Sequence, residues 1–244
     1  MAAYGIIFLL SFAASLNLPP EFKRCRFTDK RRDECLKDAI QDALILLRNG
    51  LREFNFPKLE PIEVEGMTIG NGNGTVHLDQ YYKNVKIYGI TEVKIDNVRT
   101  EDDGNIMKLF LNGTIPEVRM MANYDITGKV LLIPIHGSGK CTIKLSNVFC
   151  SPAVIAEHYD ANGIGYSKVQ QFITTTIPEK VEFDFENLFG GNDIGKEINK
   201  LINQEWEIIF HDLRPAIETA LGAIFKDITN IIYTKVPFND LFPQ

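Results

Sequence analysis

An apolar stripe with helical spacing runs from Asp193 to about Tyr233, close to the C-terminus. The stripe is formed by Ile194, Ile198, Leu201, Ile202, Ile209, Leu213, Ala216, Ile217, Ala220, Leu221, Ile224, Ile228 and Ile231. Asp193 is expected to cap the helix and Pro215 to kink it. Such a helix would be about 60 Å long, whereas a compact chain of this length has a diameter of about 45 Å. The helix therefore either breaks at Pro215 or runs through an elongated molecule, with a sheet wrapped along it.

Between residues 60 and 185 the hydrophobic pattern has a period of two, which is typical of strands. The clearest strand is 117–127, whose apolar face carries Val118, Met120, Ala122, Tyr124 and Ile126. Further strands are expected at 74–78, 84–90, 91–98, 105–115, 129–135, 140–149, 154–159, 166–177 and 181–185. Turns are expected at 71–74, 102–104, 137–139 and 161–163. These short connections favour an antiparallel meander with one buried face, preceded by a helix at 28–49.

The N-terminus is typical of a signal peptide. Its apolar run, 5–14, is too short for a membrane span, which needs roughly 20 residues, and has the length of a signal-peptide core. Ala13 and Ser15 supply the small residues that favour cleavage after Ser15, although residues 1–4 contain no Lys or Arg and a buried N-terminal helix is the alternative. The sequons at Asn73 and Asn112 are candidate glycosylation sites. The sequence thus predicts a secreted protein.

The four cysteines, Cys25, Cys35, Cys141 and Cys150, allow three disulfide connectivities in an exported chain. A Cys25–Cys35 bond would close a small loop and pin the N-terminal segment to the first helix. The stretch between Cys141 and Cys150 alternates like a strand, which would separate their Cα atoms by about 30 Å. A disulfide needs less than about 7 Å, so those two cysteines can pair only if the chain bends near 146–147, and we favour two buried thiols.

Signatures of other function classes are absent from the sequence. The formal net charge of −6 offers no basic excess for nucleic acid. No nucleophile-elbow motif occurs, and the segment 137–140 fails as a phosphate loop because Pro134 and Cys141 occupy required Gly and Ser/Thr positions. No Cys or His spacing fits a zinc site. We therefore expect no enzyme activity, no cofactor and no metal, with a lipid esterase as the weaker alternative.

The chain resembles the takeout / juvenile-hormone-binding protein family of insects over nearly its whole mature length. The motifs that carry the resemblance are LPPEF at 18–22, Cys25 and Cys35-Leu36, YKNVKIYG at 82–89, NLFGG at 187–191, NQEW at 203–206, LRP at 213–215 and VPFNDLFP at 236–243. The hormone carriers of this family have a second disulfide from a strand to the long helix. The C-terminal motifs resemble the takeout branch more than these carriers, and the long helix here contains no Cys.

This resemblance implies an α+β fold in which a highly curved antiparallel sheet wraps a long C-terminal helix, a TULIP-like super-roll with a short N-terminal helix. It implies one domain over 16–244, a Cys25–Cys35 disulfide and an apolar tunnel. The implied function is a secreted, monomeric carrier, in haemolymph or sensory-organ fluid, of a juvenile-hormone-like terpenoid, fatty acid or other lipid, without stable membrane insertion and with a link to circadian rhythm. The alternative is an extracellular lipid pattern-recognition or signalling protein.

The alternating strands and the long helix supply candidates for the tunnel wall. The candidates are Leu109, Leu111, Met120, Ala122, Tyr124, Ile143, Leu145, Trp206 and Phe210. Trp206 and Phe210 are four residues apart and would share one helix face. Tyr124 is expected to orient a ligand carbonyl or epoxide through its hydroxyl. The alternative is that Tyr124 and Trp206 are ordinary core aromatics.

Overall fold

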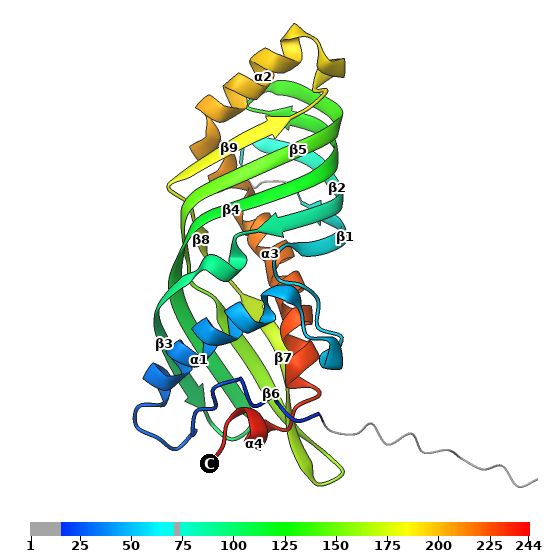
Figure 1. The fold of residues 1–244 in the computed structure, drawn as a ribbon. Helices are drawn as coiled ribbons and strands as arrows, with labels where there is room; N and C mark the ends of the chain where they lie inside the picture. The colour runs from blue at the N-terminus through cyan, green and yellow to red at the C-terminus, as the bar shows by residue number, and fades with distance from the viewer. Residues whose placement is uncertain (1–15, 71–73) are drawn as a thin grey trace, which may run out of the picture.

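The computed structural model describes residues 16–70 and 74–244. The expected signal peptide and Asn73 lie outside these residues. Figure 1 shows an elongated molecule in which a strongly curved sheet winds along one long helix. The helices are α1 (Arg32–Leu46), α2 (Asp193–Gln204), α3 (Trp206–Tyr233) and α4 (Phe238–Leu241). The strands are β1 (Ile62–Ile69), β2 (Val76–Tyr88), β3 (Lys94–Asp102), β4 (Ile106–Val130), β5 (Ile133–Cys150), β6 (Ala153–Ala161), β7 (Ile164–Ile173), β8 (Thr176–Ile177) and β9 (Lys180–Phe185).

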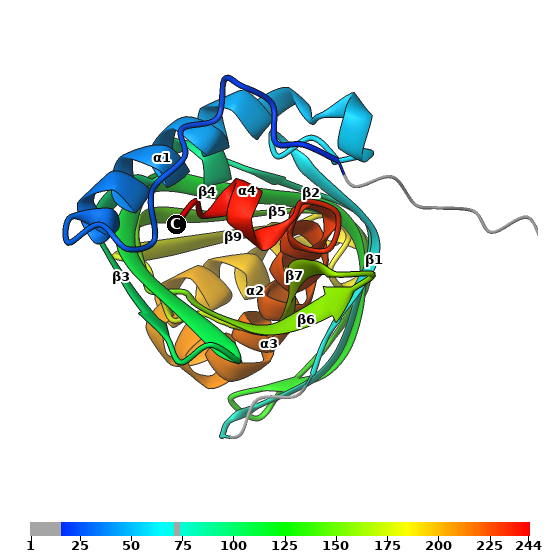
Figure 2. The same cartoon turned by 90° about the horizontal axis from the view of Figure 1, so that it is seen from below.

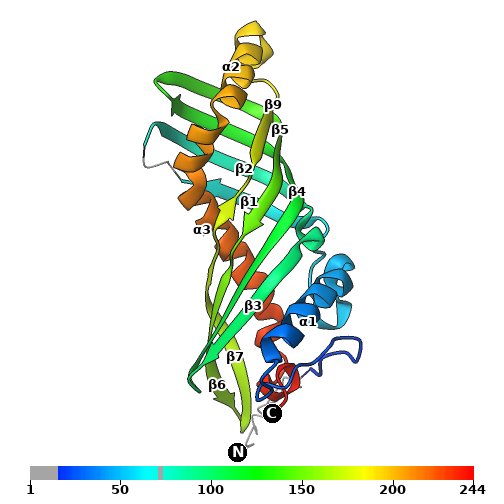
Figure 3. The same ribbon diagram turned by 90° about the vertical axis from the view of Figure 1, so that its left-hand side faces the viewer.

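The predicted curved antiparallel sheet is confirmed, but the strand order differs from a meander. All pairings are antiparallel, and β4 lies at the centre. The N-terminal part of β4 pairs with β3 at 107–114 and with β6 at 106–110. Its remaining length pairs with β5 at 113–130 and with β2 at 119–130. One long strand thus changes neighbours along its length, which lets the sheet coil around α3 (Figure 3).

Several strand boundaries expected from the sequence are wrong. The expected strands 74–78 and 84–90 form the single strand β2, and the expected strand 129–135 is divided by the turn between β4 and β5. The expected strands 105–115 and 117–127 form the single strand β4, in which Pro116 lies opposite Asn147. Asn147 has a φ of 46°, so the ladder is already irregular where proline cannot donate a hydrogen bond. The expected turn at 137–139 lies inside β5, and the β4–β5 hairpin instead turns at Leu131 and Leu132, both with positive φ.

The glycines that suggested a turn at 137–139 serve a close approach between chain segments. A Cβ at Gly137 would lie 3.0 Å from the Cα of Leu188, and a Cβ at Gly139 would lie 2.7 Å from the carbonyl oxygen of Glu186. Glycine is required here because the backbone after β9 crosses directly over β5. A local turn signal cannot distinguish this use of glycine from a hairpin.

The expected long helix is present but is interrupted at a different residue. The break falls at Glu205, with φ −100° and ψ 21°, between α2 and α3. The N-cap is Asn192, not Asp193: its side chain accepts a hydrogen bond from the Gly195 N–H at 3.1 Å. Helix α3 continues through Pro215. Pro215 and His211 are both exposed, so water can hydrate the carbonyl that proline leaves without a donor.

Helix side chains complete the hydrogen bonds of edge strands. The Asn199 and Asn203 amides on α2 each pair with both backbone groups of one residue of β9, Phe185 and Phe183 respectively, at 2.7–3.0 Å. Their spacing of four on the helix matches the spacing of two on the strand. Asn230 on α3 does the same for β7. These contacts satisfy an edge that no further strand covers.

The two chain ends close the lower end of the roll in Figure 1. The N–H of Leu18 donates to Asp240 at 2.7 Å, and the N–H of Phe27 donates to the Pro243 carbonyl at 2.7 Å. Figure 2 shows α1, the N-terminal segment and α4 lying across this end. The expected Cys25–Cys35 disulfide is present, with the Cα atoms 5.8 Å apart, and ties this segment to α1.

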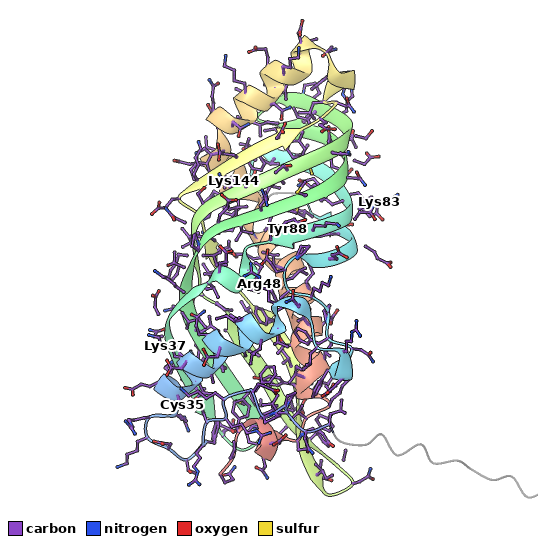
Figure 4. The ribbon with its side chains drawn as sticks, viewed as in Figure 1. Cys35, Lys37, Arg48, Lys83, Tyr88 and Lys144 are labelled. Carbon is purple, nitrogen blue, oxygen red and sulfur yellow. A yellow bond between two sulfur atoms is a disulfide. The ribbon has the colours of Figure 1, made fainter. Side chains whose placement is uncertain are left out.

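The sheet has the expected apolar inner face and polar outer face. Along 117–127 the residues alternate between inward apolar and outward polar positions, and Met121 is an exposed exception. Lys144, labelled in Figure 4, lies on the outer face within 3.1 Å of Glu117 and 3.8 Å of Glu182. Such exposed ion pairs contribute little, so burial of the inner face dominates the stability.

Candidate functional site

An apolar cavity of about 480 Å³ lies between the inner face of the sheet and helix α3. Its wall comprises residues of the N-terminal segment, α1, all nine described strands, α2, α3 and the C-terminal segment. The lining is overwhelmingly aliphatic and aromatic. Cavities of about 300–1,000 Å³ with such walls are typical of small-molecule sites. The inward positions of the strands and one stripe of the helix thus build a space suited to an apolar molecule.

Most of the expected tunnel residues lie on this wall. The strands contribute Leu109, Leu111, Met120, Ile143 and Leu145, and helix α3 contributes Phe210. The alternation of each strand explains why every second residue reaches the cavity. The structure therefore brings together residues from β4, β5 and α3 that are far apart in the chain.

Ala122, Tyr124 and Trp206 do not line the cavity. Ala122 is buried beside Cys141 on β5, its register partner. Trp206 is half-buried at the start of α3, with the Lys180 ammonium 5.4 Å from its ring centre. Trp206 therefore packs near the start of β9, and of the two expected helix aromatics only Phe210 lies on the cavity wall.

Tyr124 occupies a core position away from the cavity wall, in line with the alternative to its expected role as a ligand handle. Its hydroxyl donates a hydrogen bond to the carbonyl of Glu186, and its ring packs edge-on against Phe185 at 4.9 Å. Burial raises the pKa of Tyr124 to about 12, with smaller contributions from Cys141 and Glu186. The hydroxyl is therefore already satisfied by the segment that crosses β5.

Replacement of Tyr124 by phenylalanine tests this assignment. Tyr124→Phe leaves the Glu186 carbonyl without its donor, so we expect a loss of about 0.5–1.5 kcal/mol in the free energy of unfolding. Binding of an apolar fluorescent probe should be unchanged. Urea denaturation and probe titration measure the two effects, with the exposed Tyr81→Phe as control. Tenfold weaker binding at unchanged stability would return Tyr124 to the ligand site.

Sequence reasoning missed a polar pair on the cavity wall, Gln80 and Tyr82 of β2. Both line the cavity, and only 4% and 1% of their surfaces are exposed. The Tyr82 hydroxyl donates to Oε1 of Gln80 at 3.0 Å, and burial raises the pKa of Tyr82. Within the described ranges 16–70 and 74–244, the Nε2 of Gln80 has no hydrogen-bond partner. The available signal was a glutamine at an inward position between Leu78 and Tyr82.

Cys141 and Cys150 are not bonded to each other and remain free thiols, as favoured from the sequence. Cys141 is buried in the sheet, and Cys150 is half-buried on the cavity wall. Burial raises the pKa of Cys141 to about 12 and that of Cys150 to about 11. Both thiols are therefore protonated near neutral pH and are poor nucleophiles.

A Ser–His–Asp contact lies outside the cavity. His158 Nδ1 is 2.9 Å from the Ser167 hydroxyl, and its Nε2 is 3.2 Å from Asp102. In serine hydrolases the serine bonds Nε2 and the aspartate bonds Nδ1, so the ring is reversed here. Ser167 is fully buried and Phe238 packs on the His158 ring at 4.4 Å. The contact joins β3, β6 and β7 to α4 and gives a substrate no access to the serine.

Asn112, the second sequon, lies within β4, where its Oδ1 accepts a hydrogen bond from Ser151 at 2.7 Å. Its glycosylation remains a prediction. Among the residues that the structure describes, no helix combines the length and apolarity needed to cross a bilayer. Within 16–70 and 74–244, no group of three or more His, Cys, Asp or Glu side chains could hold a metal ion.

A curved antiparallel sheet that wraps a long helix, with an apolar interior between the two, defines the class of TULIP-like super-roll proteins. The chain belongs to the haemolymph juvenile hormone binding protein (JHBP) family, whose family model matches residues 6–243. The expected family and fold class are thereby confirmed.

Relatives and a solved structure match over most of the chain. The circadian clock-controlled protein daywake of Drosophila melanogaster is 29% identical over 238 residues, covering 95% of this chain and 90% of the relative. Daywake of Drosophila yakuba is 28% identical, covering 94% and 90%. The crystal structure of Epiphyas postvittana Takeout 1 superimposes with a TM-score of 0.76 at 22% identity, covering 91% of this chain and all of that one. This last likeness supports the fold.

Proposed function

We propose that the protein is a secreted carrier that holds a small hydrophobic ligand inside the roll. The observation that carries the proposal is the apolar cavity of about 480 Å³. Burial of about 300 Å² of apolar ligand surface stabilises a complex by roughly 7 kcal/mol. Association costs reduce this gain, and a preformed cavity limits the reduction. The proposed ligand classes are a juvenile-hormone-like terpenoid, a fatty acid or another lipid that fits the cavity.

Mass spectrometry tests the carrier function directly. Protein purified from the medium of insect cells should release a lipid on organic extraction, and native mass spectra should show the matching mass difference. Protein stripped of lipid should then bind an apolar fluorescent probe. If extraction yields no lipid and the stripped protein binds no probe, the carrier function is wrong and a signalling role without a ligand replaces it.

Secretion is the second part of the proposal. The family is named for a haemolymph protein, and the N-terminal sequence is typical of an export signal. Expression of the full chain in insect cells should deliver protein to the medium, with an N-terminus at or near Leu16 on Edman sequencing. Recovery of the chain in a membrane pellet with Met1 intact would contradict export.

We further propose a monomeric binding protein without enzyme activity. The reversed and buried Ser167–His158–Asp102 contact supports this proposal, because the serine is closed to a substrate. Turnover of a lipid ester above background would overturn it. Circadian control, which the names of both fruit-fly relatives carry, belongs to the same proposal.

A further inference from the structure

Gln80 is an unexplained polar residue in an apolar enclosure. It occupies an inward position of β2, and its register partners are Ile69 on β1 and Ile126 on β4. Both isoleucines also line the cavity. These neighbours offer no acceptor, so the amide has one polar contact, with Tyr82. A buried polar group without a partner is rare in native proteins because it destabilises the fold. Its retention here points to a partner that comes from outside the chain.

Tyr82 holds one end of the Gln80 amide. With Oε1 engaged by the Tyr82 hydroxyl at 3.0 Å, the nitrogen is the remaining donor. The terminal torsion of a glutamine side chain is soft, so a small rotation brings an N–H to the lumen. An acceptor atom on a molecule in the cavity can then take that hydrogen bond.

The surroundings select a neutral acceptor. Among the described residues that line the cavity, Lys23 is the one basic residue, and it is exposed and paired with Asp38 at 2.9 Å. It belongs to the N-terminal segment at the lower end of the roll, whereas β2 lies in the upper half (Figure 1). A carboxylate beside Gln80 would be buried without a counter-charge, which is strongly unfavourable. A carbonyl or ether oxygen requires no such charge.

We propose that Gln80, held by Tyr82, is the polar anchor of the cavity and selects neutral apolar ligands that carry a carbonyl or ether oxygen over free fatty acids and plain hydrocarbons. The inference rests on the proposed carrier function. It adds a specificity residue and a ligand class to that function.

Competition against an apolar fluorescent probe tests the anchor with three ligands of one chain length: methyl palmitate, palmitic acid and hexadecane. The stripped mature protein should bind methyl palmitate roughly 3- to 10-fold more tightly than hexadecane, the effect of one hydrogen bond. Gln80→Met keeps an unbranched side chain of similar length and removes the amide, so it should abolish this ratio while retaining hexadecane binding. The exposed Gln170→Met on β7 is the matched control and should keep the ratio.

The outcomes separate the anchor from the carrier function. Equal binding of the ester and the alkane by the unaltered protein, tightest binding of palmitic acid at neutral pH, or an unchanged ratio in Gln80→Met would each overturn the anchor and leave the carrier intact. If none of the three displaces the probe and the probe itself does not bind, the carrier function fails and the anchor with it. Tyr82→Phe, which releases the amide, should lower the ratio partly. Because the ratio compares two ligands on one variant, a general loss of stability does not imitate the effect.

Discussion

Occupying the cavity with two indole rings is expected to weaken ligand binding by more than an order of magnitude. Leu145 on β5 and Leu221 on α3 both line the cavity, one from the sheet and one from the helix. In the double variant Leu145→Trp/Leu221→Trp the larger side chains occupy space that a ligand needs. If about 100 Å² of apolar ligand contact is lost, binding weakens by about 2.5 kcal/mol, which corresponds to roughly 60-fold.

Titration with an apolar fluorescent probe measures this effect, and a thermal melt shows that the variant is folded. The control is Ile208→Trp, at a position on the same helix that is 49% exposed. The control should bind as the unaltered protein does. Undiminished affinity in a folded double variant would show that ligand does not enter this cavity.

Removal of the Asn230 amide is expected to destabilise the roll strongly. Asn230 Oδ1 accepts from the Val169 N–H at 2.8 Å, and its Nδ2 donates to the Val169 carbonyl at 2.9 Å. Val169 is 1% exposed, so water cannot easily replace either bond. Asn230→Ala leaves one buried donor and one buried acceptor unsatisfied, and we expect a loss of about 2–4 kcal/mol in the free energy of unfolding.

Urea denaturation followed by circular dichroism measures the loss. Asn97→Ala, at an exposed position of β3, is the control and should change stability by less than about 0.5 kcal/mol. A similarly small effect for Asn230→Ala would mean that α3 is held to β7 by apolar packing alone. The amide contacts of α2 with β9 would then need the same reassessment.

Tyr124 and Gln80 show what a hydrophobic pattern cannot predict about a site. Inward apolar residues such as Leu109 and Met120 are recognisable because alternation assigns a face to each residue. Alternation does not say whether an inward residue meets a cavity or another side chain. Tyr124 faces inward as expected, yet the segment after β9 reaches its hydroxyl first. Gln80 faces inward too, and its unpaired nitrogen becomes visible only when its neighbours on β1 and β4 are known.

Local sequence was sufficient to predict the elements whose cause is local, namely the helical stripe of α3 and the alternation of β4. The pairing of Cys25 with Cys35 followed from the family resemblance. Hydrophobic periodicity records which residues must leave water, and that information lies within a few neighbouring positions.

Features that depend on contacts between distant segments became apparent only from the tertiary structure. The glycines 137 and 139 lie in a strand because another backbone crosses it, and the helix breaks at Glu205 rather than Pro215. The volume of the cavity between β4, β5 and α3 likewise depends on how strongly the sheet curves. The amides of α2 that bond the edge strand β9 mark where that curvature ends. Each of these depends on the packing distance between segments far apart in the chain, which no short stretch of sequence records.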